Sequence, residues 1–145
     1  MVEYNARFGD PETQVVLPRL ESDLLEILWA CAEGRLAALP PLKWRAGACA
    51  TVVWASAGYP ASADKGRVIS GLDLAVAAPG ALVFHAGTGR AGGAWTTQGG
   101  RVLAVSGLGP DLARALAAAY AAGSLIRFDG MQFRRDIGHR ALARG

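Results

Sequence analysis

The stretch Ala-Cys-Ala-Thr-Val-Val-Trp-Ala-Ser, residues 48–56, decides the fold class of this chain. It is rich in β-branched and aromatic residues and leads into the turn sequence Gly58-Tyr59-Pro60, which predicts a β-strand closed by a turn. Short apolar runs bounded by glycine predict further strands at residues 67–70, 81–85, 94–97 and 101–106. The Gly99-Gly100 pair predicts a hairpin turn between the last two.

Two segments on either side of these strands have helical periodicity. From Ser22, a possible helix cap, Leu24, Leu28 and Cys31 share one stripe, and Gly34 closes the pattern. A second helix opens at Gly109-Pro110-Asp111 and runs to Gly123, and residues 126–133 predict one more strand. The sequence therefore predicts an α+β fold, a small antiparallel sheet or partial β-barrel with two packed helices.

The first twenty residues fit this layout poorly. Val2, Tyr4 and Ala6 alternate with Glu3, Asn5 and Arg7, as expected for a strand, and Phe8-Gly9-Asp10-Pro11 breaks it. Asp10 before Pro11 predicts a helix cap followed by a first helical position. We interpret this part as the last strand of a domain that begins upstream.

The composition narrows the function classes. A formal charge of +3 on 145 residues is mild, and no basic patch or motif favours nucleic-acid binding. Polar groups among residues 1–5 do not fit a signal peptide, and no apolar stretch is long enough for a membrane span. Cys31 and Cys49 have no C-x-x-C spacing, which indicates small buried thiols in a reducing compartment. We expect a soluble, cytoplasmic protein.

The polar row at the amino end carries the first candidate site. Glu3 and Asn5 offer hard oxygen donors of the kind that hold magnesium together with nucleotide phosphates. Arg7 is placed to neutralise charge on a transferred phosphoryl group or an acyl-phosphate. From the spacing alone, a solvated strand face with Glu3 paired to Arg7 is the simpler interpretation.

Several other residues are open to a functional and a structural interpretation. Asp10 and Glu12 suit either a helix start or a loop that reaches a small polar substrate such as an amino acid. Lys65 either meets a phosphate or is solvated, and Arg134, Arg135 and Asp136 either form an ion pair or face a phosphoribosyl group. For His85, packing with a satisfied ring is the simpler interpretation.

The segment Glu3-Tyr-Asn-Ala-Arg-Phe-Gly-Asp-Pro-Glu-Thr-Gln14 resembles the end of the ATP-grasp domain of phosphoribosylamine–glycine ligases, also called glycinamide ribonucleotide synthetases. The resemblance continues in the family's order over essentially all 145 residues. It is carried by Pro18-Arg19-Leu20, Ser22-Asp23-Leu24-Leu25-Glu26, Gly58-Tyr59-Pro60, Lys65-Gly66, Val68-Ile69-Ser70-Gly71-Leu72, Phe84-His85-Ala86-Gly87-Thr88, Gly99-Gly100-Arg101-Val102-Leu103 and Arg135-Asp136-Ile137-Gly138.

The resemblance implies an enzyme that joins glycine to 5-phosphoribosylamine, with ATP as a substrate and Mg²⁺ or Mn²⁺ as the cofactor. It assigns Glu3 and Asn5 to the divalent ion and places Arg7 by the reacting phosphate. Ala57, Ala61, Ala63 and His139 depart from the family's usual residues. These departures put the role of the 57–67 loop in substrate binding in doubt.

The resemblance also implies a division of the chain. Residues 1–20 correspond to the tail end of an ATP-grasp domain and residues 21–145 to the carboxy-terminal domain of the ligase. Without the amino-terminal and ATP-binding domains we expect no catalysis by this chain alone, and apolar surface left bare would favour self-association. The alternative is a stand-alone, noncatalytic binding or signalling module.

Overall fold

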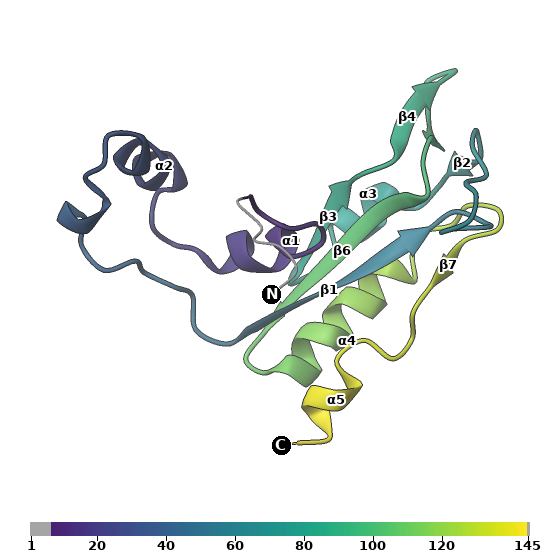
Figure 1. Ribbon diagram of the computed structural model, residues 1–145. Helices are drawn as coiled ribbons and strands as arrows, with labels where there is room; N and C mark the ends of the chain where they lie inside the picture. The colour runs from purple at the N-terminus through teal and green to yellow at the C-terminus, as the bar shows by residue number, and fades with distance from the viewer. Residues whose placement is uncertain (1–6, 145) are drawn as a thin grey trace.

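The protein is described by a computed structural model, which covers residues 7–144 (Figure 1). Its centre is a four-stranded antiparallel sheet in the order β3-β6-β1-β7. The strands are β3 (Ala81–His85), β6 (Arg101–Gly109), β1 (Ala48–Ala55) and β7 (Gln132–Phe133). The α+β class and the strand predicted at residues 48–56 are confirmed.

Helix α4 (Leu112–Gly123) covers one face of this sheet (Figure 1). Asp111 caps the helix by accepting a hydrogen bond from the Arg114 backbone N–H at 2.8 Å, as the Gly109-Pro110-Asp111 pattern predicts. Alternate β1 residues point to α4, so Val52 and Trp54 are buried against Ala119 and Ala122. The hydrophobic core therefore lies between the sheet and α4.

A second, three-stranded sheet has the order β2-β5-β4. It is built from β2 (Val68–Ile69), β5 (Ala94–Thr97) and β4 (Thr88–Ala91). The predicted Gly99-Gly100 hairpin is wrong, because β5 pairs with β2 and β4 while β6 pairs with β1 and β3. The two glycines instead carry the chain from one sheet to the other.

Other elements also differ from the sequence prediction, among them β4, which was not predicted. The short helices α3 (Leu72–Val76) and α5 (His139–Leu142) were not predicted. Of the strand predicted for residues 126–133, only β7 is a strand, and Arg127 forms an isolated bridge with Ser70.

No helix in the described part of the chain has the length and apolar character needed to cross a membrane.

The amino-terminal segment lies on the sheet face opposite α4 (Figure 1). It holds α1 (Thr13–Val16) and the 3-10 turn η1 (Leu17–Arg19). The prediction of Asp10 as a helix cap is wrong, because α1 begins after Glu12 and has no side-chain cap. The strand predicted for residues 2–7 lies outside the described residues, except for Arg7.

Residues 21–45 form an arm that leaves the sheet and carries α2 (Leu24–Ala32) and the turn η2 (Leu36–Ala38) (Figure 1). Asp23, and not the predicted Ser22, caps α2 by accepting from the backbone N–H groups of Leu25 and Glu26. Leu25 and Trp29 are 72% and 59% exposed. Of the two predicted helices, α4 therefore packs on the sheet and α2 lies away from it.

Candidate functional site

The amino-terminal segment is tied to the sheet by an ion pair. Arg101, the first residue of β6, lies with Nη2 3.2 Å from the Asp10 carboxylate, and its Nη1 donates to the Asp10 carbonyl at 3.0 Å. The Asp10 carboxylate also accepts a hydrogen bond from Gln14 Nε2 at 3.1 Å. Asp10, which the sequence predicts as a substrate-binding residue, is thus held at the start of β6 by Arg101.

A surface pocket of about 480 Å³ brings Arg7 and Glu12 to one place, beside Thr51 of β1. Arg7 is exposed and donates from Nη1 to the Phe8 carbonyl at 3.1 Å. The Glu12 side chain folds back over Gly9, so a β-carbon there would lie 1.8 Å from its Oε2. One cation and one carboxylate at a small pocket suit a zwitterion, such as an amino acid.

A second cavity, of about 410 Å³, opens where β1 ends. Tyr59, Arg101, Gln132 and Arg134 give it polar groups, and Val53, Ala55 and Phe133 give it apolar walls. Gln132 Nε2 donates to the carbonyls of Ser56 and Tyr59 at 3.0 and 2.9 Å, which joins the 56–60 loop to β7. We call this the β1-end cavity.

Sequence reasoning did not single out Arg101, Tyr59 or Gln132 as site residues. One signal for Arg101 was present, since it is a lone charge that follows two glycines and precedes an apolar strand. The other two carry no such signal, because their place at the cavity depends on contacts across 73 and 76 residues of sequence.

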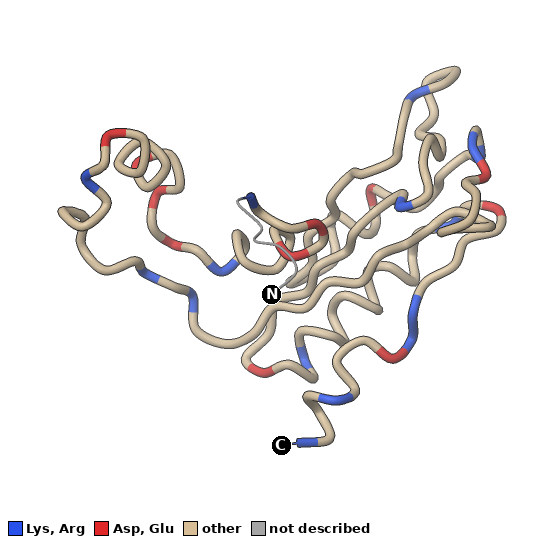
Figure 2. The backbone as a smooth tube through the Cα atoms, in the orientation of Figure 1, with Lys and Arg blue, Asp and Glu red and all other residues tan. Residues whose placement is uncertain are grey.

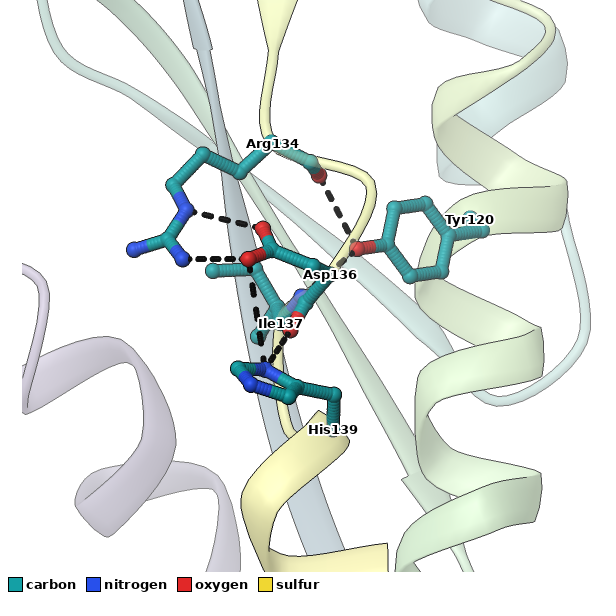
Figure 3. A network of polar contacts seen from close by, with 5 residues as sticks. All are labelled: Tyr120, Arg134, Asp136, Ile137 and His139. Carbon is teal, nitrogen blue, oxygen red and sulfur yellow. Dashed lines mark hydrogen bonds and ion pairs between the residues drawn. The ribbon is translucent and has the colours of Figure 1, made fainter.

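The segment after β7 forms a polar network (Figure 3). Arg134 donates from Nε and Nη2 to the two Asp136 carboxylate oxygens at 2.9 and 2.6 Å. The hydroxyl of Tyr120 on α4 donates to the Arg134 carbonyl at 2.9 Å, and His139 Nδ1 lies 2.8 Å from the Asp136 carbonyl. The hydrogen bond from Arg134 lowers the pKa of Asp136 and raises that of Arg134.

The predicted group of Arg134, Arg135 and Asp136 therefore divides. Arg134 and Asp136 form the ion pair, as one of the two interpretations held. Arg135 places its guanidinium carbon 5.5 Å from the centroid of the Phe133 ring, and among the described residues it has no carboxylate partner. Since Phe133 lines the β1-end cavity, Arg135 stays close to that cavity.

Two other candidates lie in exposed positions. Lys65 is exposed in the loop before β2, and none of the carboxylates among residues 7–144 forms an ion pair with it. His85 stacks on Trp95 with ring centroids 4.2 Å apart, and its Nδ1 lies 2.9 Å from Thr88 Oγ1. One ring nitrogen of His85 is thus paired and the ring packs on Trp95, in line with the packing interpretation, although the residue is exposed.

The predicted metal ligands Glu3 and Asn5 lie outside the described residues. Within residues 7–144, no three His, Cys, Asp or Glu side chains gather closely enough to hold a metal ion. In the described residues, lysine and arginine lie at scattered points, among them the arm, several loops and the segment after β7, and β1 and β3 carry none (Figure 2), in keeping with the mild net charge. The polar groups of the two pockets, the one at Arg7 and Glu12 and the β1-end cavity, are therefore mainly arginine guanidinium groups and the carboxylates near them.

Comparisons with known proteins relate this chain to one family. The family model described as "Phosphoribosylglycinamide synthetase, C domain" matches residues 49–140. The chain is 52% identical over 141 residues to a phosphoribosylamine–glycine ligase of Nostoc, which covers 97% of the chain and 33% of that relative. It is 53% identical to the enzyme of that name from Synechocystis, covering 98% of the chain and 34% of that relative.

A solved structure gives the same relation at the level of the fold. The crystal structure of a phosphoribosylamine–glycine ligase from Thermotoga maritima matches with a TM-score of 0.73 and 32% sequence identity. The match covers 94% of this chain and 32% of that one. The chain thus spans about a third of the length of the relatives it matches.

Proposed function

Because the chain belongs to the phosphoribosylglycinamide synthetase family, we propose that it is the carboxy-terminal portion of an ATP-dependent ligase that joins glycine to 5-phosphoribosylamine. The observation that carries this proposal is the likeness to ligases of that name over nearly the whole chain. In purine biosynthesis such a ligase uses ATP and releases ADP and phosphate.

The proposed reaction has two steps. The terminal phosphoryl group of ATP passes to the glycine carboxylate, which gives ADP and an acyl-phosphate. The amine of phosphoribosylamine then attacks the acyl carbon, the bond from that carbon to the phosphate oxygen breaks, phosphate leaves with the electron pair, and the nitrogen gives up one proton to solvent or to the leaving phosphate. Positioning and charge neutralisation supply most of the catalysis in such phosphoryl transfers.

The residues of this chain divide between these tasks. In the proposal, Glu3 and Asn5 hold a divalent ion, Mg²⁺ or Mn²⁺, which supplies neutralising charge to the nucleotide phosphates. Arg7 stabilises the charge on the transferred phosphoryl group. The substrate-binding group consists of Asp10, Glu12, Lys65, Arg135 and Asp136. The pocket shared by Arg7 and Glu12 supports this arrangement, because it offers both charges of glycine a partner.

We further propose that residues 1–20 complete an ATP-grasp domain and that residues 21–145 form the carboxy-terminal domain. The partners of the chain are then the ATP-binding and amino-terminal domains of the ligase, together with glycine, phosphoribosylamine and ATP. The exposed apolar side chains on α2 support a contact with a further domain or a second copy. Residues 1–145 by themselves are expected to be inactive.

A chimeric enzyme tests the proposal. The last third of the Nostoc ligase is replaced by residues 1–145 of this chain, and ADP release is measured with and without glycine and phosphoribosylamine. The same assay is run on the 145-residue chain alone. We expect ADP release from the chimera that needs both substrates, no release from the chain alone, and loss of release in the chimera carrying Glu3→Ala.

Three outcomes would count against parts of the proposal. A folded chimera without activity would favour the noncatalytic module. Activity of the chain alone would show that it needs no further domain. Near-normal turnover of the Glu3→Ala chimera would remove Glu3 from the metal site while leaving the ligase assignment in place.

A further inference from the structure

We propose that the β1-end cavity binds the phosphate group of a pentose 5-phosphate, with Arg101 and Arg134 as its main ligands. The inference rests on the proposed function, since phosphoribosylamine is the substrate that carries such a group. It gives Arg101 a role that the sequence pattern did not suggest, and it places Arg134, for which an ion pair and a phosphoribosyl contact were both open, at the same phosphate.

The size and lining of the cavity fit a sugar phosphate. Its volume of about 410 Å³ lies in the range of roughly 300–1,000 Å³ typical of small-molecule sites. Among the described residues, its lining contains two guanidinium groups and no carboxylate. Val53, Ala55 and Phe133 supply the apolar surface against which a sugar ring packs.

Arg101 is held in place with donors to spare. A guanidinium has five N–H donors; in Arg101, Nη1 donates to the Asp10 carbonyl and Nη2 forms an ion pair with the Asp10 carboxylate. The contact with Asp10 fixes the planar group in advance, so little rotamer entropy is lost when a phosphate binds the remaining donors. Arg101 therefore acts as a preformed phosphate ligand at the start of β6.

Arg134, which lines the same cavity, offers a similar arrangement. Asp136 occupies its Nε and Nη2, which leaves the donors on Nη1 free of the ion pair. The neighbouring Arg135 lies over Phe133, a lining residue, and adds a third positive charge nearby. Three arginines against two aspartates leave this corner of the protein net positive, which favours a dianionic phosphate.

The wall of the cavity formed by Tyr59 and Gln132 is fixed by hydrogen bonds and close packing. Gln132 fixes the backbone of the 56–60 loop through two hydrogen bonds, to the carbonyls of Ser56 and Tyr59. The Tyr59 ring lies so close to Gly100 that a β-carbon there would be 2.3 Å from ring carbon Cδ2. Glycine at position 100 is therefore required for the ring to line the cavity beside Arg101.

The cavity also lies next to the segment proposed to carry the chemistry. Arg101 lines the cavity and contacts Asp10 directly. Asp10 lies two residues before Glu12, which lines the pocket shared with Arg7. A pentose whose phosphate is held by Arg101 is thus placed beside residues 7–12, where its amine is needed.

Ligand binding to the intact 145-residue chain tests the inference without any turnover. Isothermal titration calorimetry compares ribose 5-phosphate, ribose, inorganic phosphate and ATP as ligands. We expect saturable binding of ribose 5-phosphate, and weaker binding of ribose and of inorganic phosphate. Arg101→Gln and Arg134→Gln should each weaken binding by about tenfold or more, as expected for loss of a charge-assisted hydrogen bond.

The matched control is Arg90→Gln, because Arg90 is also an exposed arginine but lies over Trp95 in the β4–β5 hairpin. It should bind ribose 5-phosphate like the parent chain. Equal binding of ribose and ribose 5-phosphate, no binding of ribose 5-phosphate, or equal affinities of Arg101→Gln and Arg90→Gln would overturn the inference. Tighter binding of ATP than of ribose 5-phosphate, lost in Arg101→Gln, would assign the cavity to a nucleotide and also overturn it.

The chimera separates this inference from the proposed function. With an active chimera, Arg101→Gln should raise the KM for phosphoribosylamine by about tenfold or more while the KM values for ATP and glycine stay unchanged. An active chimera whose KM for phosphoribosylamine ignores Arg101→Gln would sink the inference and leave the function standing. An inactive chimera together with Arg101-dependent binding of ribose 5-phosphate would do the opposite.

Discussion

Arg101 Nη2 lies 3.2 Å from the Asp10 carboxylate, across 91 residues of sequence. The contact joins the first residue of β6 to the segment that precedes α1. It also connects the two pockets, because Arg101 lines the β1-end cavity and Asp10 lies beside the residues of the other. The ion pair thus fixes the Arg101 guanidinium and the segment around Asp10 relative to each other.

Asp10→Asn should change stability little. The two side chains are 40% and 50% exposed, and half-exposed ion pairs contribute at most about 1 kcal/mol, because water and salt screen them. Urea denaturation should therefore give a loss below about 1 kcal/mol that shrinks in 1 M salt. Glu21→Gln, at an exposed position, is the control. A loss above about 2 kcal/mol would mean that the pair is a structural anchor.

Ser106→Ala should cost more than loss of the ion pair. The Ser106 side chain is fully buried, and its hydroxyl donates to the Gln14 carbonyl at 2.7 Å and lies 2.9 Å from Thr51 Oγ1. Alanine leaves that carbonyl without its donor, at a cost of about 1–3 kcal/mol in the free energy of unfolding. Hydrogen exchange of the α1 amides should also become faster. Ser124→Ala, at an exposed serine, should stay within about 0.5 kcal/mol of the parent.

Gly123→Ala should destabilise the protein although it lies in a helix. In an open helix the change stabilises by about 1 kcal/mol. Here a β-carbon would lie 1.9 Å from Cζ2 of the buried Trp54 ring, so the indole or the helix has to move. We expect a loss of about 1–3 kcal/mol, seen as a lower thermal midpoint. An unchanged or higher midpoint would show that the Trp54 indole or α4 can move aside at no cost.

Elements whose stabilising contacts are local were predictable from the sequence. The β1 run and the α4 segment carry their patterns within themselves, with Asp111 as a visible cap. The division into two sheets was not predictable. Nothing local shows that β5 pairs with β4 across Gly92-Gly93 and not with β6 across Gly99-Gly100, since both glycine pairs are equally good turns.

In the candidate site, too, residues with local sequence signals were predicted and contacts between distant residues were not. The acidic and basic residues of the segment at positions 7–12 were recognised, because they are adjacent in sequence. The partner of Asp10 was not, because an antiparallel sheet of non-consecutive strands decides which residue meets it. Likewise the sequence could not distinguish Arg134 from Arg135 as the partner of Asp136, since both are within reach and the turn held by Tyr120 selects Arg134.

The two cysteines should react at very different rates. Cys31 is exposed on α2, which corrects the prediction of a buried thiol, and Cys49 is buried on β1. Burial raises the pKa of the Cys49 thiol, although the nearby Arg19 partly opposes this shift. A thiol reagent at pH 8 should thus modify one cysteine quickly and the other slowly. Cys31→Ser should remove the fast phase, and a fast phase that survives would place Cys49 at the surface.

The pKa of Asp136 offers a test of the network in Figure 3. The hydrogen bond from Arg134 lowers this pKa below the value of about 3.9 that is usual for an unfolded chain. A carboxyl with a depressed folded pKa stabilises the fold above its unfolded pKa. That contribution is lost as the pH falls through the lower, folded value. The contribution of Asp136 to stability is therefore expected to change with pH below about 4 and not near neutrality.

A carboxyl NMR titration should give a midpoint for Asp136 below the usual range, and Arg134→Gln should move it back up. Arg140→Gln, an exposed arginine of the same segment, should leave the midpoint in place. Equal midpoints in the parent and in Arg134→Gln would mean that the ion pair does not persist in solution. Arg134 would then be free to turn fully toward the β1-end cavity.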